Sequence, residues 1–84
     1  MAKIDIDDLV AFSALADLGS FSAAAEHIHS SQPAFSRRID KLEKALESQL
    51  VERTTRQVML TATGRDFHRN VQRILSDLDT TVMG

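Results

Sequence analysis

The central feature of the sequence is the stretch Phe21–Leu46, which reads FSAAAEHIHSSQPAFSRRIDKLEKAL. It predicts a short helix, a tight turn and a longer helix over residues 32–46. Ser22 precedes three alanines, which favour helix, and we expect its hydroxyl to cap the first helix. We expect Ser31 to cap the second, where Pro33 loses only a donor that is unpaired in any first turn. Two helices joined in this way form a helix-turn-helix, whose second helix enters the DNA major groove.

The longer helix is predicted to be amphipathic. At about 100° per residue, one face is apolar and consists of Phe35, Ile39, Leu42 and Leu46. The opposite face carries Pro33, Arg37, Asp40, Lys41 and Lys44, with Gln32 and Ser36 on the flanks. Arg, Gln and Ser are side chains that hydrogen-bond to base edges, and a helix N-terminus attracts phosphate. Periodicity alone fits a solvated helix on the surface of a bundle equally well.

The same residues resemble the DNA-binding domain of LysR-type transcriptional regulators. The resemblance rests on the following segments: Phe21–His29, Ser31–Arg37 (SQPAFSR), Ile39, Leu42-Glu43, Leu50–Arg53, Leu60-Thr61 and Gly64. It covers nearly the whole chain, and the SQPAFSR core is much more specific than a general helix-turn-helix pattern. Three positions depart from the family's pattern: Glu47 replaces the usual glycine, Val51 a common phenylalanine and Ser30 a common branched aliphatic residue.

The resemblance implies a mainly α fold, a winged helix-turn-helix with a three-helix core and a short two-stranded β wing, followed by a long linker helix. It places the DNA-binding domain at residues 1–61 and the linker, or dimerisation, helix at residues 62–84. In this family a C-terminal domain of periplasmic-binding-protein type binds the small-molecule effector. No part of such a domain occurs in these 84 residues.

The segments that flank the central stretch supply the remaining elements. Residues 4–18 are predicted to form a scaffold helix, with acidic residues at its start, where the macrodipole favours them, and Gly19 at its end. Phe21 is expected to fill the core between helices. Residues 51–60 alternate in the manner of a small hairpin, and the absence of glycine predicts a looser loop than a tight turn.

The hairpin carries two arginines, Arg53 and Arg56, which are expected to reach phosphate or the minor groove. The alternative is that they are solvated surface arginines. Side-chain types and the resemblance together assign DNA contacts to ten residues: Ser22, Ser31, Gln32, Pro33, Ser36, Arg37, Lys41, Arg53, Thr54 and Arg56.

Residues 62–83 are predicted to form the last helix, capped by Thr61 and about 33 Å long. A coiled-coil-like seam runs along it and consists of Phe67, Val71, Ile74, Leu75, Leu78 and Val82. Phe67 and Val71 are close enough to the domain to pack on its core, whereas the later positions need a partner. The resemblance supplies that partner as the same helix of a second subunit. It therefore implies a homodimer on an inverted-repeat operator in double-stranded DNA, and a higher oligomer in full-length members.

The net charge of −2 is unusual for a DNA-binding protein, but the charge is unevenly distributed. Residues 1–30 carry one lysine against five carboxylates, whereas residues 31–69 carry eight basic and five acidic side chains. The positive charge therefore coincides with the predicted reading helix and wing, where local phosphate contacts determine affinity.

Other classes of function have little support in the sequence. There is no cysteine, and His27 and His29 point to different faces of a helix, so we expect no metal and no cofactor. No nucleophile–base pair or phosphate-binding glycine loop indicates an enzyme. No apolar run predicts a membrane span, and we expect a cytoplasmic location. The main alternative is a helical dimerisation or protein-interaction module that has lost DNA binding, for which an exposed Gln32, Pro33, Ser36 and Arg37 would have no use.

Overall fold

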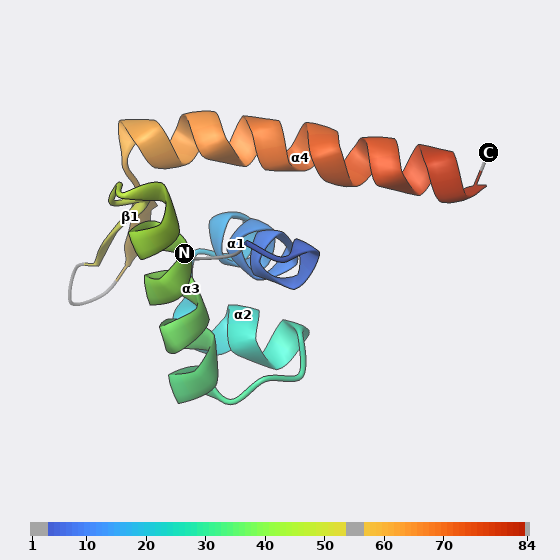
Figure 1. Ribbon diagram of the computed structural model, residues 1–84. Coiled ribbons are helices and arrows are strands. Elements are labelled where there is room, and N and C mark those ends of the chain that lie inside the picture. The colour runs from blue at the N-terminus through green and yellow to red at the C-terminus, as the bar shows by residue number, and fades with distance from the viewer. Residues whose placement is uncertain (1–3, 54–56, 84) are drawn as a thin grey trace.

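The described residues form four helices and a two-stranded sheet (Figure 1). The computed structural model describes residues 4–53 and 57–83, with side chains described as far as residue 78. The elements are α1 (Ile6–Leu18), α2 (Phe21–His27), α3 (Gln32–Leu46), β1 (Val51–Arg53), β2 (Val58–Leu60) and α4 (Ala62–Met83). The predicted winged helix-turn-helix followed by a long helix is confirmed.

The core lies where α1, α2 and α3 meet, and α4 runs across α1 on the other side (Figure 1). Its largest fully buried apolar side chains are Phe12, Phe35, Leu15, Ile39, Leu42, Leu50, Val51 and Val71. Full burial of a side chain of this size contributes about 1.5–3 kcal/mol. Phe21 is only half-buried, and its ring stands edge-on to Phe35 with the centroids 5.8 Å apart. The apolar face predicted for α3 is therefore the face that holds the bundle together.

The cap of α2 differs from the prediction. The helix begins at Phe21, and the capping hydroxyl belongs to Ser20, which accepts a hydrogen bond from the Ala23 N–H at 3.2 Å. Ser22 lies exposed within the first turn. The assignment of Ser22 as N-cap was wrong because Phe21 takes helical backbone geometry, with its ring packed against Phe35. For α3 the prediction is confirmed, since Ser31 Oγ accepts from the Ala34 N–H at 3.3 Å.

The end of α3 contains a strained position. Glu47 has a φ of 53°, in the left-handed region that glycine adopts at no steric cost. We expect Glu47→Gly to raise the free energy of unfolding by about 0.5–1 kcal/mol. Glycine relieves the strain of the left-handed backbone, and the greater conformational entropy of glycine in the unfolded chain offsets part of that gain. Urea denaturation followed by circular dichroism measures this. Glu47→Ala is the control, since it removes the charge but keeps the Cβ; an equal gain in both variants would attribute the effect to charge.

The wing is the predicted antiparallel hairpin, with Val51 paired to Leu60 and Arg53 to Val58. The expected loose loop falls on residues 54–56, which lie outside the described part. The hairpin leads directly into α4, whose predicted cap is confirmed: Thr61 Oγ1 accepts from the Gly64 N–H at 3.0 Å. The same hydroxyl donates to the Gln49 carbonyl at 2.6 Å, so one threonine joins the start of α4 to the chain before β1.

Gly64 lies where α4 contacts the backbone before the wing. A Cβ at this position would lie 2.0 Å from the Leu50 carbonyl oxygen, which already accepts from the Thr61 N–H. We expect Gly64→Ala to destabilise the chain by roughly 1–3 kcal/mol, despite the higher helix propensity of alanine. The measurement is chemical denaturation, with Gln72→Ala at an exposed site of α4 as the control. A Gly64→Ala variant at least as stable as the original would show that the junction can relax.

The start of α4 packs on the core, whereas two apolar side chains further along the helix are exposed. Val71 has no exposed surface, and Phe67 is half-buried with its ring centroid 5.2 Å from that of Phe12. Val71 therefore packs on the chain's own core, as its position close to the domain predicts, and its part in a dimer seam stays a prediction. Ile74 and Leu78 are 42% and 44% exposed. The side chain of Val82 lies outside the described part.

Candidate nucleic-acid interface

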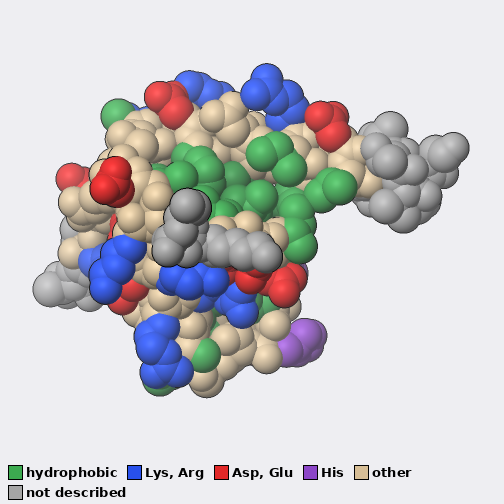
Figure 2. Space-filling view, viewed as in Figure 1, with side chains coloured by type: hydrophobic (Ala, Val, Ile, Leu, Met, Phe, Trp, Pro, Cys, Tyr) green, Lys and Arg blue, Asp and Glu red, His purple; other side chains and the backbone are tan. Residues whose placement is uncertain are grey.

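The outward face of α3 presents the predicted reading residues. Gln32, Pro33 and Arg37 are exposed and Ser36 is half-buried, while Phe35 between them is fully buried. Lys and Arg side chains gather over this part of the molecule, below α4 (Figure 2). The first turn of α3 also offers backbone N–H groups and the positive end of a 15-residue helix. The surface therefore combines side chains that can hydrogen-bond to base edges with a helix end that attracts anions.

A buried ion cluster fixes α3 against α1. Asp8 of α1 has no exposed surface, and its carboxylate receives Arg38 Nη1 at 2.9 Å and Lys41 Nζ at 3.1 Å from α3. It also accepts the Asp5 N–H at 3.0 Å. Lys41, predicted to contact DNA, thus has its ammonium engaged by Asp8 although it is exposed. Sequence reasoning missed this role of Asp8. The available signal was its spacing, because Asp8 falls in register with the buried Ala11, Phe12 and Leu15.

Asp8 is held in its charged form. Burial by itself raises the pKa of Asp8, but the Asp5 N–H and the two cations outweigh it and hold the pKa below its ordinary value of 3.8. A carboxylate with a lowered pKa stabilises the fold above its unfolded pKa, and that contribution is lost as the pH falls through the folded pKa. The contribution of Asp8 is therefore complete at neutral pH and is lost as the pH falls below about 4 and through the lowered pKa of Asp8.

We expect Asp8→Asn to lower the free energy of unfolding at pH 7 by about 1–3 kcal/mol, because it removes two charge-assisted contacts. The difference from the original chain should shrink below about pH 4 as Asp8 becomes protonated. Denaturation across this pH range measures both effects, with the exposed neighbouring Asp7→Asn as the control. A difference that stays constant down to the most acidic pH would contradict the ionic role of Asp8.

Two carboxylates of α3 are also engaged within the domain. Glu43 Oε2 accepts the backbone N–H groups of Leu50 at 2.8 Å and of Val51 at 3.3 Å, which fixes the start of the wing. Asp40 Oδ1 accepts from Arg53 Nη2 at 2.8 Å. These acidic side chains are thus used to attach the wing to α3.

The wing residues are only partly described. The Arg53 side chain is 43% exposed, and its guanidinium lies 4.7 Å from the Phe21 ring centroid as well as against Asp40. The structure thus brings Arg53 to α3, and it does so through contacts within the chain. Thr54 and Arg56 lie outside the described residues. Ser22 and Ser31 are both exposed at the N-terminal ends of α2 and α3. Their hydroxyls already form hydrogen bonds within the chain.

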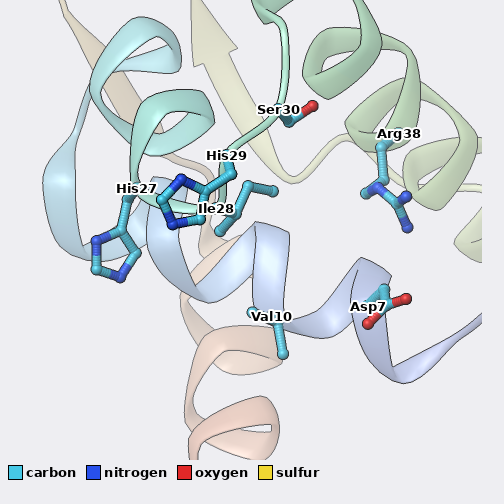
Figure 3. Close-up of a pocket in the computed structure, with 7 residues that line it drawn as sticks. All are labelled: Asp7, Val10, His27, Ile28, His29, Ser30 and Arg38. Atoms are coloured by element: carbon cyan, nitrogen blue, oxygen red, sulfur yellow. The ribbon is translucent and has the colours of Figure 1, made fainter.

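A groove of about 640 Å³ lies between α1 and the turn that joins α2 to α3. Its lining residues are Asp7, Val10, His27, Ile28, His29, Ser30 and Arg38 (Figure 3). Within residues 4–53 and 57–83, no three His, Cys, Asp or Glu side chains lie close enough together to hold a metal ion. In the same part of the chain, none of the helices has both the length and the apolar character needed to cross a membrane.

Comparison with protein families and curated proteins gives consistent matches. A family model described as "Bacterial regulatory helix-turn-helix protein, lysR family" matches residues 6–65. An uncharacterized HTH-type transcriptional regulator in the ibpB-leuC intergenic region of Azotobacter vinelandii is 46% identical over 78 residues, which are 93% of this chain and 54% of that protein. The uncharacterized HTH-type transcriptional regulator YbhD of Escherichia coli (strain K12) is 39% identical over 95% of this chain and 25% of its own length. The chain thus spans between a quarter and about half of these relatives.

Solved structures match over nearly the whole chain. The crystal structure of the BenM DNA-binding domain with catB site 1 DNA superimposes with a TM-score of 0.92 at 35% identity, covering 95% of this chain and 90% of that one. The CbnR DNA-binding domain in its complex with DNA gives a TM-score of 0.88 at 36% identity, covering 93% and 90%. Both of these domains were crystallised on DNA.

Proposed function

This chain belongs to the lysR family of bacterial regulatory helix-turn-helix proteins, and we propose that it binds double-stranded DNA sequence-specifically as the DNA-binding domain of a transcriptional regulator. The observation that carries the proposal is the N-terminal half of α3, where Gln32, Pro33 and Arg37 are exposed on a helix whose other face is buried. The same fold is bound to DNA in the BenM and CbnR complexes.

Each predicted residue has a place in this proposal. Gln32, Ser36 and Arg37 read base edges in the major groove, because their side chains can hydrogen-bond to them. Ser31, Pro33 and the α3 N-terminus lie along the phosphate backbone, as does Ser22 at the start of α2. Lys41 is shared between Asp8 and the DNA backbone. The wing, with Arg53, Thr54 and Arg56, contacts the flanking backbone or minor groove.

The exposed half of α4 supports a second proposal, that the chain forms a homodimer. Ile74 and Leu78 are exposed on α4, and hydrophobic side chains gather along the α1 side of α4 in Figure 2. A continuous apolar patch on a small domain is typical of a protein contact. We propose residues 1–61 as the DNA-binding unit and 62–84 as the helix that pairs, with Phe67 and Leu75 at the edge of the contact and Val82 within it.

The length of the relatives supports the remaining proposals. Because the chain spans a quarter of YbhD, we propose that it works within a longer regulator, where a C-terminal domain binds the effector and allows a higher oligomer. The operator is an inverted repeat, since a two-fold dimer presents two equivalent reading helices. The place of action is the cytoplasm, where the DNA is.

The test is a fluorescence-anisotropy titration at several salt concentrations. One duplex is selected by the chain from a randomised pool, and the control is a scrambled duplex of the same composition. We expect binding to the selected duplex to be at least about ten-fold tighter, with log K falling linearly with log salt. Equal affinity for both duplexes, or binding to neither, would favour the interaction module that has lost DNA binding.

A further inference from the structure

Arg53 of β1 joins three elements of the domain. Its guanidinium donates to Asp40 of α3 at 2.8 Å and lies 4.7 Å from the ring centroid of Phe21 of α2. Phe21 itself stands edge-on to the fully buried Phe35. The arginine therefore lies on a ring that is packed against the core, with a carboxylate at its side.

These contacts orient the arginine more than they stabilise the fold. The side chains of Asp40 and Arg53 are 51% and 43% exposed, and an ion pair so accessible to water contributes little net free energy. A cation over a half-buried ring such as that of Phe21 is likewise a modest contact. Together, however, they fix a long side chain at its end, and the entropy of ordering that side chain no longer has to be overcome on binding.

The oriented guanidinium retains donors for another partner. Arginine has five N–H donors in a planar fork, and among the described residues the Asp40 carboxylate accepts one of them. Asp40 lies on the same exposed face of α3 as Pro33 and Arg37. The remaining donors of Arg53 therefore lie beside the surface that carries the reading residues, where a phosphate of bound DNA would pass.

We propose that Asp40 is a positioning residue for DNA recognition, which holds the Arg53 guanidinium, and with it strand β1, in the orientation that donates to the DNA backbone. The proposal rests on the proposed function. It accounts for a carboxylate on a surface that faces phosphates, where an unpaired negative charge would only repel DNA. Asp40 acts through Arg53 and reads no base itself.

A double-mutant cycle isolates this role. The variants are Asp40→Asn, Arg53→Gln and the double substitution, each titrated with the selected and the scrambled duplex described above. Removal of the Asp40 charge also removes repulsion of phosphates, and this general effect is measured alone in the Arg53→Gln background. The difference between the two backgrounds is the coupling between Asp40 and Arg53.

Asp40→Asn changes the affinity for the selected duplex in each background. We expect this change to be about 3- to 10-fold less favourable in the original chain than in the Arg53→Gln chain. Asp40→Glu should restore part of this coupling, because it keeps the carboxylate. Asp66→Asn is the matched control, since it removes an exposed carboxylate that pairs with Arg69 on α4, away from α3. It should show no coupling to Arg53. Thermal unfolding of each variant confirms that the titrated chains are folded.

Two results would overturn the proposal. Equal effects of Asp40→Asn in both backgrounds would show that the pair has no part in binding. If Asp40→Asn raised the affinity more in the original chain than in the Arg53→Gln chain, Asp40 would hold Arg53 away from the DNA and compete with it. Both results require an original chain that binds the selected duplex; an original chain that binds no duplex would instead contradict the proposed function.

Discussion

Replacement of both Ile74 and Leu78 with aspartate should give a monomer that binds an inverted-repeat duplex about 100-fold more weakly, or worse. The two side chains are 42% and 44% exposed on α4, beyond Val71, which the core covers completely. A dimer binds its second half-site intramolecularly, so loss of the dimer removes that gain in effective concentration. The fold should persist because neither side chain belongs to the buried core.

Sedimentation equilibrium measures the mass, and anisotropy measures binding to an inverted repeat and to a single half-site. The affinity for a single half-site should change little. This result would separate loss of the dimer from loss of DNA recognition by α3. Gln72→Asp with Ser76→Asp is the matched control, since it adds the same charge at exposed positions on the opposite side of α4. An original chain that stays monomeric well above micromolar concentration, or a variant that still dimerises, would exclude α4 as the pairing helix.

Replacement of Arg37 by alanine should weaken binding to the selected duplex by about 5- to 150-fold, corresponding to roughly 1–3 kcal/mol for one bidentate base contact. Arg37 is exposed in the second turn of α3. It is adjacent to Arg38, which Asp8 engages. The preference at one base pair should relax, because a base contact supports one sequence over the others.

The measurement is anisotropy on the selected duplex, on its single-base variants and on the scrambled duplex. Lys44→Ala is the control, since Lys44 is exposed on the same helix nearer its C-terminus. A lysine that contacts only phosphate should weaken binding to all sequences about equally. If Arg37→Ala also lowered affinity for every duplex by the same factor, Arg37 would be a phosphate contact and base reading would belong to other residues.

Local signals were sufficient for the elements that position the reading surface. The bounds of α3, Gln32–Leu46, are those predicted, because a capping serine, a proline in the first turn and an apolar stripe all indicate the same helix. The hairpin and the capping of α4 by Thr61 were predicted for the same kind of reason. The exposure of Pro33 and Arg37 follows from the helical period alone, whereas that of Gln32, on a flank of the helix, does not.

What only the tertiary structure decided is which polar groups meet. No periodicity indicates that Asp8 pairs with Arg38 and Lys41, 30 and 33 positions away, or that Arg53 reaches Asp40 and Phe21. The hydrophobic pattern places Val71 on one stripe with Ile74 and Leu78, and only the structure shows that the chain's own core covers Val71 while the other two side chains stay exposed. Polar pairing depends on the distance and angle at which helices cross, and those are set by the packing of many side chains at once.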